Sequence, residues 1–224
     1  MCASLRDALE ASGPVIPRMV RPAASLPAAQ DADLKIVQKP IIFDDVRMKL
    51  TLDYIRKHSG ELVSGIEFTP RMIVLHRTNI DTLEGSYEAL RPLILPQPQA
   101  GQSEQAQREV NSSVHYLVDK DGSIYSLMLD FYIDRHVVGL DRYAIGISNV
   151  GSDAASMTNA QLQADQRLIQ LLTQKYNNIL WLMGASEAEA FKGTNYREVA
   201  ADPGNQFMSR LRTQIAKLQL KSAP

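Results

Sequence analysis

The chain has 224 residues, of which 45% are hydrophobic and 22% are charged. This length and composition are typical of one folded globular domain and exclude disorder over the whole chain. With 24 basic and 25 acidic residues the net charge is -1, so the chain lacks the cationic excess that neutralises nucleic-acid phosphates. No apolar run approaches the roughly 20 residues of a membrane-spanning helix. We therefore expect neither a nucleic-acid partner nor a membrane span.

The single cysteine, Cys2, excludes an intramolecular disulfide and a cysteine-based metal cluster. Two interpretations of it stay open. It is an ordinary thiol in an N-terminal tail, or it is the acylated cysteine of a bacterial lipoprotein whose signal peptide has been removed. No signal peptide is visible in the chain as given.

The N-terminal stretch is rich in Pro and Ala and has no helical or strand periodicity. It predicts an irregular arm over residues 1–33, followed by one folded domain over 34–224. At the start of that domain, apolar residues at Met48, Leu52 and Ile55 before Ser59-Gly60 predict a short amphipathic helix over 48–58.

Compact apolar runs then predict buried strands over 71–76, 144–150 and 179–183. Residues 114–119 and 123–128 flank Lys120-Asp121-Gly122, a turn sequence that predicts a β-hairpin. Residues 91–108 are rich in Gln and Pro, which favours a surface loop.

Two further helices complete the expected elements. Thr158 with Gln161 three residues later fits a capping box before an apolar helical face, and a second apolar face recurs from Phe207 to Leu218. Strands mixed with helices, including one hairpin, predict an α/β domain with a single mixed β-sheet flanked by helices.

Five motifs of the chain resemble, in the same order, those of the zinc-dependent N-acetylmuramoyl-L-alanine amidases of type 2, which are related to peptidoglycan recognition proteins. They are Arg-Met-Ile-Val-Leu-His-Arg-Thr at 71–78, the segment 110–125 around His115, Arg-His-Val-Val-Gly at 135–139, Ala-Ile-Gly-Ile-Ser-Asn-Val-Gly at 144–151, and Asp-Pro-Gly at 202–204. The resemblance covers residues 50–218 and implies the fold of that family.

The resemblance also implies a zinc ion held by three protein ligands, with a water molecule in the fourth position. His76 matches the first ligand and Asp202 the third, but the second ligand position is Ala185, which has no lone pair to donate. The position of the catalytic base is Ser148, and the position that steadies the oxyanion is Ala200. The expectation is therefore a remnant of a metal site, with no catalytic residues and no cofactor.

Other residues were considered for the missing roles. His58 lies at the end of the first helix, His115 is expected to be hydrogen-bonded inside the hairpin, and for His136 a cleft-lining role and a surface-loop role stay open. Glu187, Glu189 and Glu198 follow the lost ligand, and we interpret them as solvated charges on a loop.

Three functions stay open for a chain that lacks the expected ligand, base and oxyanion residues at these positions. The first is a non-catalytic domain that binds peptidoglycan or muropeptides in a cleft, since affinity comes from groove contacts that outlast the chemistry. The candidate cleft residues are Arg77, Asn79, Tyr116, His136 and Asn149. The second is a scaffold or adaptor in an envelope protein complex. The third is an active zinc amidase whose ligands are shifted in sequence. The resemblance places all three in the periplasm or cell envelope.

Overall fold

The computed structural model describes residues 34–60, 63–95, 109–187 and 201–222. In this part of the chain six strands form one sheet in the order β1-β4-β3-β5-β2-β6. The strands are β1 (Ile36–Gln38), β2 (Met72–Arg77), β3 (Tyr116–Val118), β4 (Ile124–Ser126), β5 (Ala144–Asn149) and β6 (Trp181–Gly184). Only the β3–β4 hairpin pairs antiparallel within this sheet, and the other neighbouring strands pair parallel. The predicted mixed sheet is confirmed.

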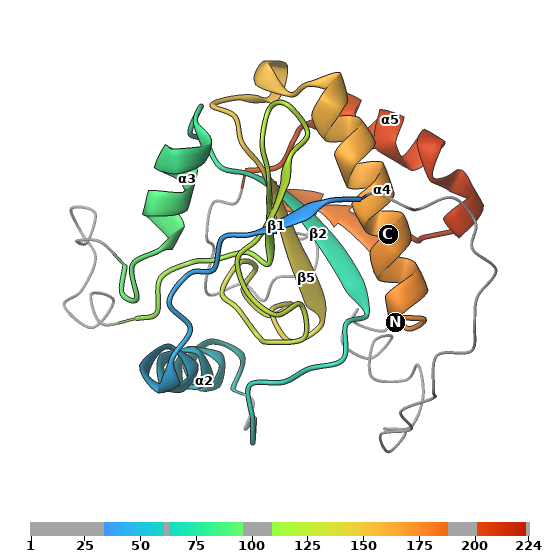
Figure 1. Ribbon diagram of the computed structural model, residues 1–224. Helices are drawn as coiled ribbons and strands as arrows, with labels where there is room; N and C mark the ends of the chain where they lie inside the picture. The colour runs from blue at the N-terminus through green and yellow to red at the C-terminus, as the bar shows by residue number, and fades with distance from the viewer. Residues whose placement is uncertain (1–33, 61–62, 96–108, 188–200, 223–224) are drawn as a thin grey trace.

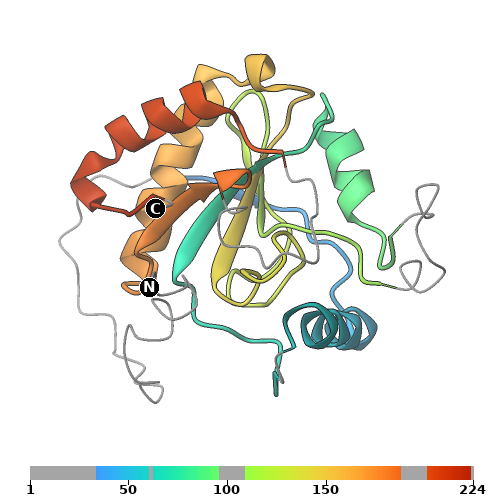
Figure 2. The same cartoon turned by 180° about the vertical axis from the view of Figure 1, so that it is seen from behind.

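Helices cover both faces of the sheet. They are α2 (Asp45–Ser59), α3 (Leu83–Leu90), α4 (Asn159–Lys175) and α5 (Asn205–Gln214), with short 3₁₀ turns η2 (Ala154–Ser156) and η4 (Ala216–Leu218). Figure 1 shows α4 and α5 on one side of the sheet and α2 and α3 on the other, and Figure 2 shows the same division from behind.

The largest apolar core lies between the sheet and the helices α4 and α5. Ile73 and Leu75 of β2 contribute to it, together with Leu168 of α4 and Leu211 of α5. The opposite face of β2 carries Met72 and Val74 into a separate cluster beneath the loop of residues 137–143. Because side chains alternate along a strand, β2 is buried on both faces, as its continuous apolar run predicts.

Local sequence signals explain where the elements begin and turn. The Thr158 side chain accepts a hydrogen bond from the Gln161 amide, and the Gln161 side chain accepts one from the Thr158 amide, which is the predicted capping box. α2 ends at Ser59, and its C-cap residue Gly60 has a left-handed φ of 68°. In the hairpin turn Gly122 has a φ of 86°, a conformation that glycine adopts without strain.

The strands and helices expected from the sequence are all present, with shifted ends. The first helix begins earlier than predicted, at Asp45, and the C-terminal helix ends earlier, at Gln214, before η4. β1 and α3 were not expected from the sequence. The predicted N-terminal arm and most of the predicted 91–108 loop lie outside the described residues. Among the helices that are described, none combines the length and hydropathy needed to cross a bilayer.

The carboxyl-terminal end of α4 is fastened to the sheet by the buried carboxylate of Asp130. This carboxylate accepts hydrogen bonds from Tyr176 Oη at 2.6 Å, Lys175 Nζ at 2.9 Å and Tyr116 Oη at 3.1 Å. Burial alone would raise the pKa of Asp130, but the hydrogen bonds from Tyr176, Lys175 and Tyr116 outweigh it and leave the pKa below its ordinary value.

We predict that Asp130→Asn lowers the free energy of unfolding by about 2 kcal/mol at pH 7, because hydrogen bonds to a buried charged group are lost. Since the folded-state pKa is depressed, this contribution is present above pH about 4 and disappears as the pH falls through the folded-state pKa. Urea unfolding of both proteins from pH 7 downward measures it. Asp53→Asn, which removes an exposed pair with Arg56, is the matched control and should change stability by less than about 0.5 kcal/mol.

Candidate functional site

His76 lies near the carboxyl end of β2, on the face of the sheet turned away from α4 and α5. Successive side chains of a strand point to opposite faces. His76 therefore shares the face of Val74, whereas Leu75 lies in the core under α4. In the parallel pairing of β2 with β5, the partner of His76 is Ser148. We call this surface, defined by His76, Ser148 and Ala185, the His76 face.

Ala185 lies on the other side of His76, just after β6. Leu75 pairs with Gly184, and the Ala185 amide continues the pattern by donating to the Leu75 carbonyl at 2.8 Å. Ala185 is fully buried and belongs to the same apolar cluster as Val74. The three positions thus come together as the resemblance implies, but they carry one imidazole, one methyl group and one hydroxyl. The fourth position, Ala200, lies outside the described residues.

The imidazole of His76 is engaged by a second histidine. His76 Nε2 lies 2.9 Å from His136 Nδ1, and the two rings meet edge to face. His136 Nε2 lies 3.2 Å from the carbonyl of Ala144, which can only accept, so the proton of the His136 ring is on Nε2. Burial lowers the pKa of His136 well below its ordinary value, with His76 and His115 adding to the effect. The neutral ring then offers a lone pair at Nδ1, and His76 Nε2–H is the donor.

A fully buried pair, His115 and Asp134, lies behind His136. His115 Nδ1 accepts from the Gly146 amide at 3.0 Å, so its proton is on Nε2, which donates to the Tyr132 carbonyl at 2.9 Å. The Asp134 oxygens lie 3.4 Å from His115 Nδ1 and 3.3 Å from His136 Nε2. Burial, with Asp141 nearby, raises the pKa of Asp134 well above its ordinary value. Burial therefore disfavours the charged forms of His115, His136 and Asp134.

The carboxylate of Asp202 sits over Gly184 and is held by its own neighbours. Oδ2 accepts from the hydroxyl of Ser186 and from its amide at 3.3 Å, while Oδ1 accepts from the Gly204 amide at 2.8 Å. A Cβ at Gly184 would lie 2.8 Å from Asp202 Oδ2, so glycine is needed there to let the carboxylate approach. Asp202 thus closes an Asx turn before α5, whose N-cap residue is Gly204, and does not itself cap the helix.

His76, Asp202 and Ala185 do not together provide the ligands of a zinc site. His76 Nε2 carries the proton shared with His136, Asp202 already accepts three hydrogen bonds, and Ala185 has no donor atom. Among residues 34–60, 63–95, 109–187 and 201–222, no group of three or more His, Cys, Asp or Glu side chains is arranged to hold a metal ion. The expectation that the protein uses no cofactor stays a prediction, because residues 188–200 lie beyond this part of the chain.

Of the five predicted cleft residues, one is exposed, two are engaged in hydrogen bonds near His76, and two lie on the opposite face of the sheet. Asn79 is exposed beyond the end of β2 with a left-handed φ of 60°, where its side chain can meet a ligand. Arg77 is half-buried, and its guanidinium donates to the carbonyl oxygens of Asp202 and Ser152, so it joins two loops. His136 is 6% exposed, so it is neither a surface-loop residue nor an open cleft wall.

The predictions for Tyr116 and Asn149 are corrected by the structure. Tyr116 lies in the core under α4 and donates to Asp130. Asn149 is fully buried, and its Nδ2 donates to Asp165 of α4 at 2.8 Å. Because Ser148 faces His76, its neighbour Asn149 must face the other side of the sheet. Neither side chain can line a cleft on the His76 face.

The acidic residues near the lost ligand were expected to be solvated. Glu187 instead accepts from both terminal nitrogens of Arg212 in α5 and from the Gly184 amide. It is therefore turned toward α5 and away from His76. Glu189 and Glu198 lie outside the described residues.

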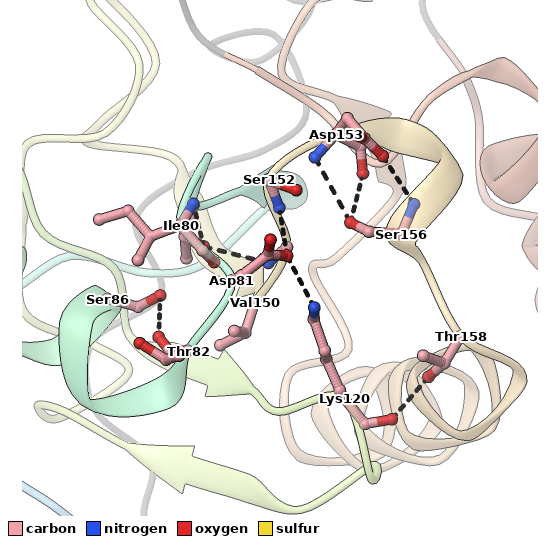
Figure 3. Close-up of polar contacts among 12 residues, drawn as sticks. Ile80, Asp81, Thr82, Ser86, Lys120, Val150, Ser152, Asp153, Ser156 and Thr158 are labelled. Atoms are coloured by element: carbon pink, nitrogen blue, oxygen red, sulfur yellow. Dashed lines mark hydrogen bonds and ion pairs between the residues drawn. The ribbon is translucent and has the colours of Figure 1, made fainter.

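Three loops meet at the carboxyl edge of the sheet in a polar network that the sequence did not suggest. Figure 3 shows Asp81, after β2, accepting from Lys120 Nζ at 2.7 Å and from the Ser152 amide at 3.1 Å. The carbonyl of Lys120 accepts from Thr158 at the start of α4. The sequence analysis also missed Asp134 and Ser186. The only signal for Asp134 is its position two residues before His136.

Comparison with known families and structures gives a consistent result. A family model described as N-acetylmuramoyl-L-alanine amidase, Amidase_2, matches residues 67–204. This range includes β2 to β6 and leaves out β1 and α2. Comparison with curated proteins gave no match.

Several solved structures resemble the chain. The N-acetylmuramoyl-L-alanine amidase LysC from Clostridium intestinale URNW aligns with a TM-score of 0.53 and 21% identity, covering 84% of this chain and 99% of that one. The endolysine N-acetylmuramoyl-L-alanine amidase LysCS from the same organism aligns with a TM-score of 0.52 and 20% identity. This alignment covers 84% of this chain and 97% of that one. Drosophila peptidoglycan recognition protein SA aligns with a TM-score of 0.41 and 22% identity. This alignment covers 59% of this chain and 78% of that one. The first two similarities show a shared fold.

We predict that His115→Phe lowers the free energy of unfolding by about 3 kcal/mol, because the Gly146 amide and the Tyr132 carbonyl lose their partners inside the core. Burial lowers the pKa of His115 to about 4. Unfolded histidine titrates near 6.5, so the contribution of His115 to wild-type stability should be lost as the pH falls from about 6.5 to 4. NMR of the His115 ring should show no protonation above pH about 5. A midpoint near 6.5 would contradict the assigned hydrogen bonds.

Proposed function

Because this chain belongs to the N-acetylmuramoyl-L-alanine amidase family, we propose that it acts at bacterial peptidoglycan as a domain that binds the polymer without hydrolysing it. The amidase resemblance supplies the class of ligand, the lactyl-peptide stem of the cell wall. The argument against hydrolysis comes from the side chains of the His76 face.

The observation that carries the proposal is the register of β2 with its two neighbours. It fixes His76 between Ser148 and Ala185 on one face. A zinc amidase requires a second imidazole and a general base at those positions. A methyl group cannot bind a metal, and a serine hydroxyl is not a base near neutral pH. General acid–base catalysis alone contributes about 10²–10⁴ in rate.

A binding role is supported by the polar groups that remain at the carboxyl edge. Asn79, Ser152 and Ser186 are exposed there, and Asp202 is half-buried beside them. Hydroxyl, carboxamide and carboxylate groups can pair with the amides and carboxylates of a peptide stem. Ligand contacts of this kind do not require a metal.

The cellular setting follows from the same family membership. We place the protein in the periplasm or elsewhere in the cell envelope, with acylation of Cys2 as one means of anchoring it. A scaffold role within an envelope complex is the outcome to consider if muropeptides do not bind.

We predict that the purified protein, dialysed against micromolar zinc, retains well under one equivalent of the metal and releases no peptide from peptidoglycan. The test compares it with Ala185→His and with Ala185→His/Ser148→Glu. The single variant adds an imidazole but no base, so it should gain zinc without hydrolysis. Any gain in hydrolysis should appear only in the double variant. Elemental analysis and peptide release measure both. One equivalent of zinc together with hydrolysis by the wild type would show that the active amidase is the correct alternative.

We predict that a muropeptide with an intact lactyl-peptide bond binds the wild type in a calorimetric titration. Asn79→Gly suits the left-handed backbone and removes only the carboxamide, so it should weaken binding by roughly three- to tenfold, the effect of one hydrogen bond. Gln174→Ala, at an exposed position near the end of α4, is the control and should bind as the wild type does. A folded wild type that binds no muropeptide would contradict the proposal.

A further inference from the structure

The side of β5 opposite Ser148 is held by two fully buried polar residues of α4. Gln161 and Asp165 are one helical turn apart and therefore lie on the same side of the helix. Gln161 Nε2 donates to the carbonyls of Val150 at 2.9 Å and Val118 at 3.1 Å. Asp165 accepts from Asn149 at 2.8 Å. Both contacts fall at the carboxyl end of β5.

The contact between Asp165 and Asn149 is only half formed. Asn149 Nδ2 donates to Asp165 Oδ2, but Asp165 Oδ1 and Asn149 Oδ1 are both buried and neither has a hydrogen-bond partner among the described residues. Two acceptor oxygens cannot pair with each other. If Asp165 carries a proton, its Oδ1–H can donate to Asn149 Oδ1, and the acid and the carboxamide then form two hydrogen bonds.

No counter-charge faces Asp165 from the described elements packed around it. β5 presents the neutral Asn149, and β3 presents the Val118 carbonyl, which Gln161 occupies. α5 contributes the apolar side chains of Phe207, Met208 and Leu211 to this core.

The charged groups on these elements are engaged or directed elsewhere, and Arg212 of α5 pairs with Glu187. The Arg77 guanidinium of β2 donates to backbone carbonyls, and Arg210 of α5 donates to Asn159. On α4 itself Arg167 is exposed, and Lys175 pairs with Asp130 at the far end of the helix. Burial accordingly raises the pKa of Asp165 to about 7, although the hydrogen bond from Asn149 lowers it.

We propose that Asp165 and Asn149 form a proton-dependent latch, which fastens the carboxyl end of β5 to α4 when Asp165 is protonated and weakens that attachment when Asp165 is ionised. The inference concerns the fold of this domain and does not depend on peptidoglycan binding.

The latch connects to the His76 face through the backbone. The Asn149 carbonyl accepts from the Thr78 amide at 3.0 Å, and the Gly151 amide donates to Thr78 Oγ1 at 3.2 Å. Ser152 then joins the network around Asp81 (Figure 3). Weakening the hydrogen bonds between Asp165 and Asn149 should therefore increase local opening of the segment 149–152. This segment follows Ser148 at the end of β5.

The direction of the pH effect follows from proton linkage. The folded-state pKa of Asp165 is raised, so its contribution to stability is present below the unfolded value of about 4 and is lost as the pH rises to about 7. Over that interval the ionisation of Asp165 alone should raise the unfolding equilibrium constant by up to about tenfold per pH unit, and the protonation of His115 below pH about 6.5 acts in the opposite direction. Above pH about 7 this dependence ends, because both states are ionised.

The experiment compares the wild type with Asp165→Asn in urea unfolding from pH 5 to 8. An asparagine can form both hydrogen bonds with Asn149 and does not titrate. The variant should therefore lose the pH dependence due to this group and be more stable than the wild type at pH 8. Asp53→Asn, at an exposed site on α2, is the control and should keep the wild-type dependence. A variant whose pH dependence equals that of the wild type would overturn the latch.

A second measurement uses the wild type alone and holds even if the variant does not fold. The ¹³C signal of the Asp165 carboxyl group should titrate with a midpoint near 7. Hydrogen-exchange protection of the Val150 and Gly151 amides, corrected for intrinsic rates, should decrease over the same range. A carboxyl midpoint below 5, or protection that is constant from pH 6 to 8, would contradict the proposal.

Discussion

The parallel pairing of β2 between β5 and β6 is the constraint on which the site depends. It fixes which residues of three separate chain segments share a face, since a shift of one residue would move every side chain to the opposite side of the sheet. Val74 and Leu75 lie in different cores, so a shift of one residue would move each of them into the core that the other one fills. The position of Ala185 beside His76 is therefore set by the packing of the whole sheet and not by the local sequence after β6.

The sequence allowed most of the fold to be predicted, because long apolar runs and the capping residues act locally. α3 was missed because it has only eight residues and contains Gly85 and Ser86, and β1 because it has three. The place of Asn149 follows from the strand register: Ser148 pairs with His76, and strand alternation then directs Asn149 to the other face. The contact of His136 with His76 could not be predicted, because it depends on the path of an irregular loop.

The histidine cluster provides hydrogen-bond partners for the imidazoles that lie on and behind the His76 face. Partners are present for His76 Nε2 and for both ring nitrogens of His136 and His115: His136 and His76 contact each other, His136 also contacts Ala144, and His115 contacts Gly146 and Tyr132. Hydrogen bonds of this kind offset the cost of burying polar groups. The same bonds orient the lone pair of His136 toward His76, so the arrangement that stabilises the fold also occupies a nitrogen of the first ligand position.

Because side chains alternate along a strand, the carboxyl end of β5 presents one polar residue to each face of the sheet. Ser148 faces His76, where a family enzyme would need its base, and Asn149 faces α4, where a buried acid has no counter-charge. Both residues lie at the carboxyl end of the strand, and the backbone between Asn149 and Ser152 is bonded to Thr78 and Asp81 on the neighbouring loop. A change in the bonding of Asn149 is therefore expected to reach this edge through these hydrogen bonds.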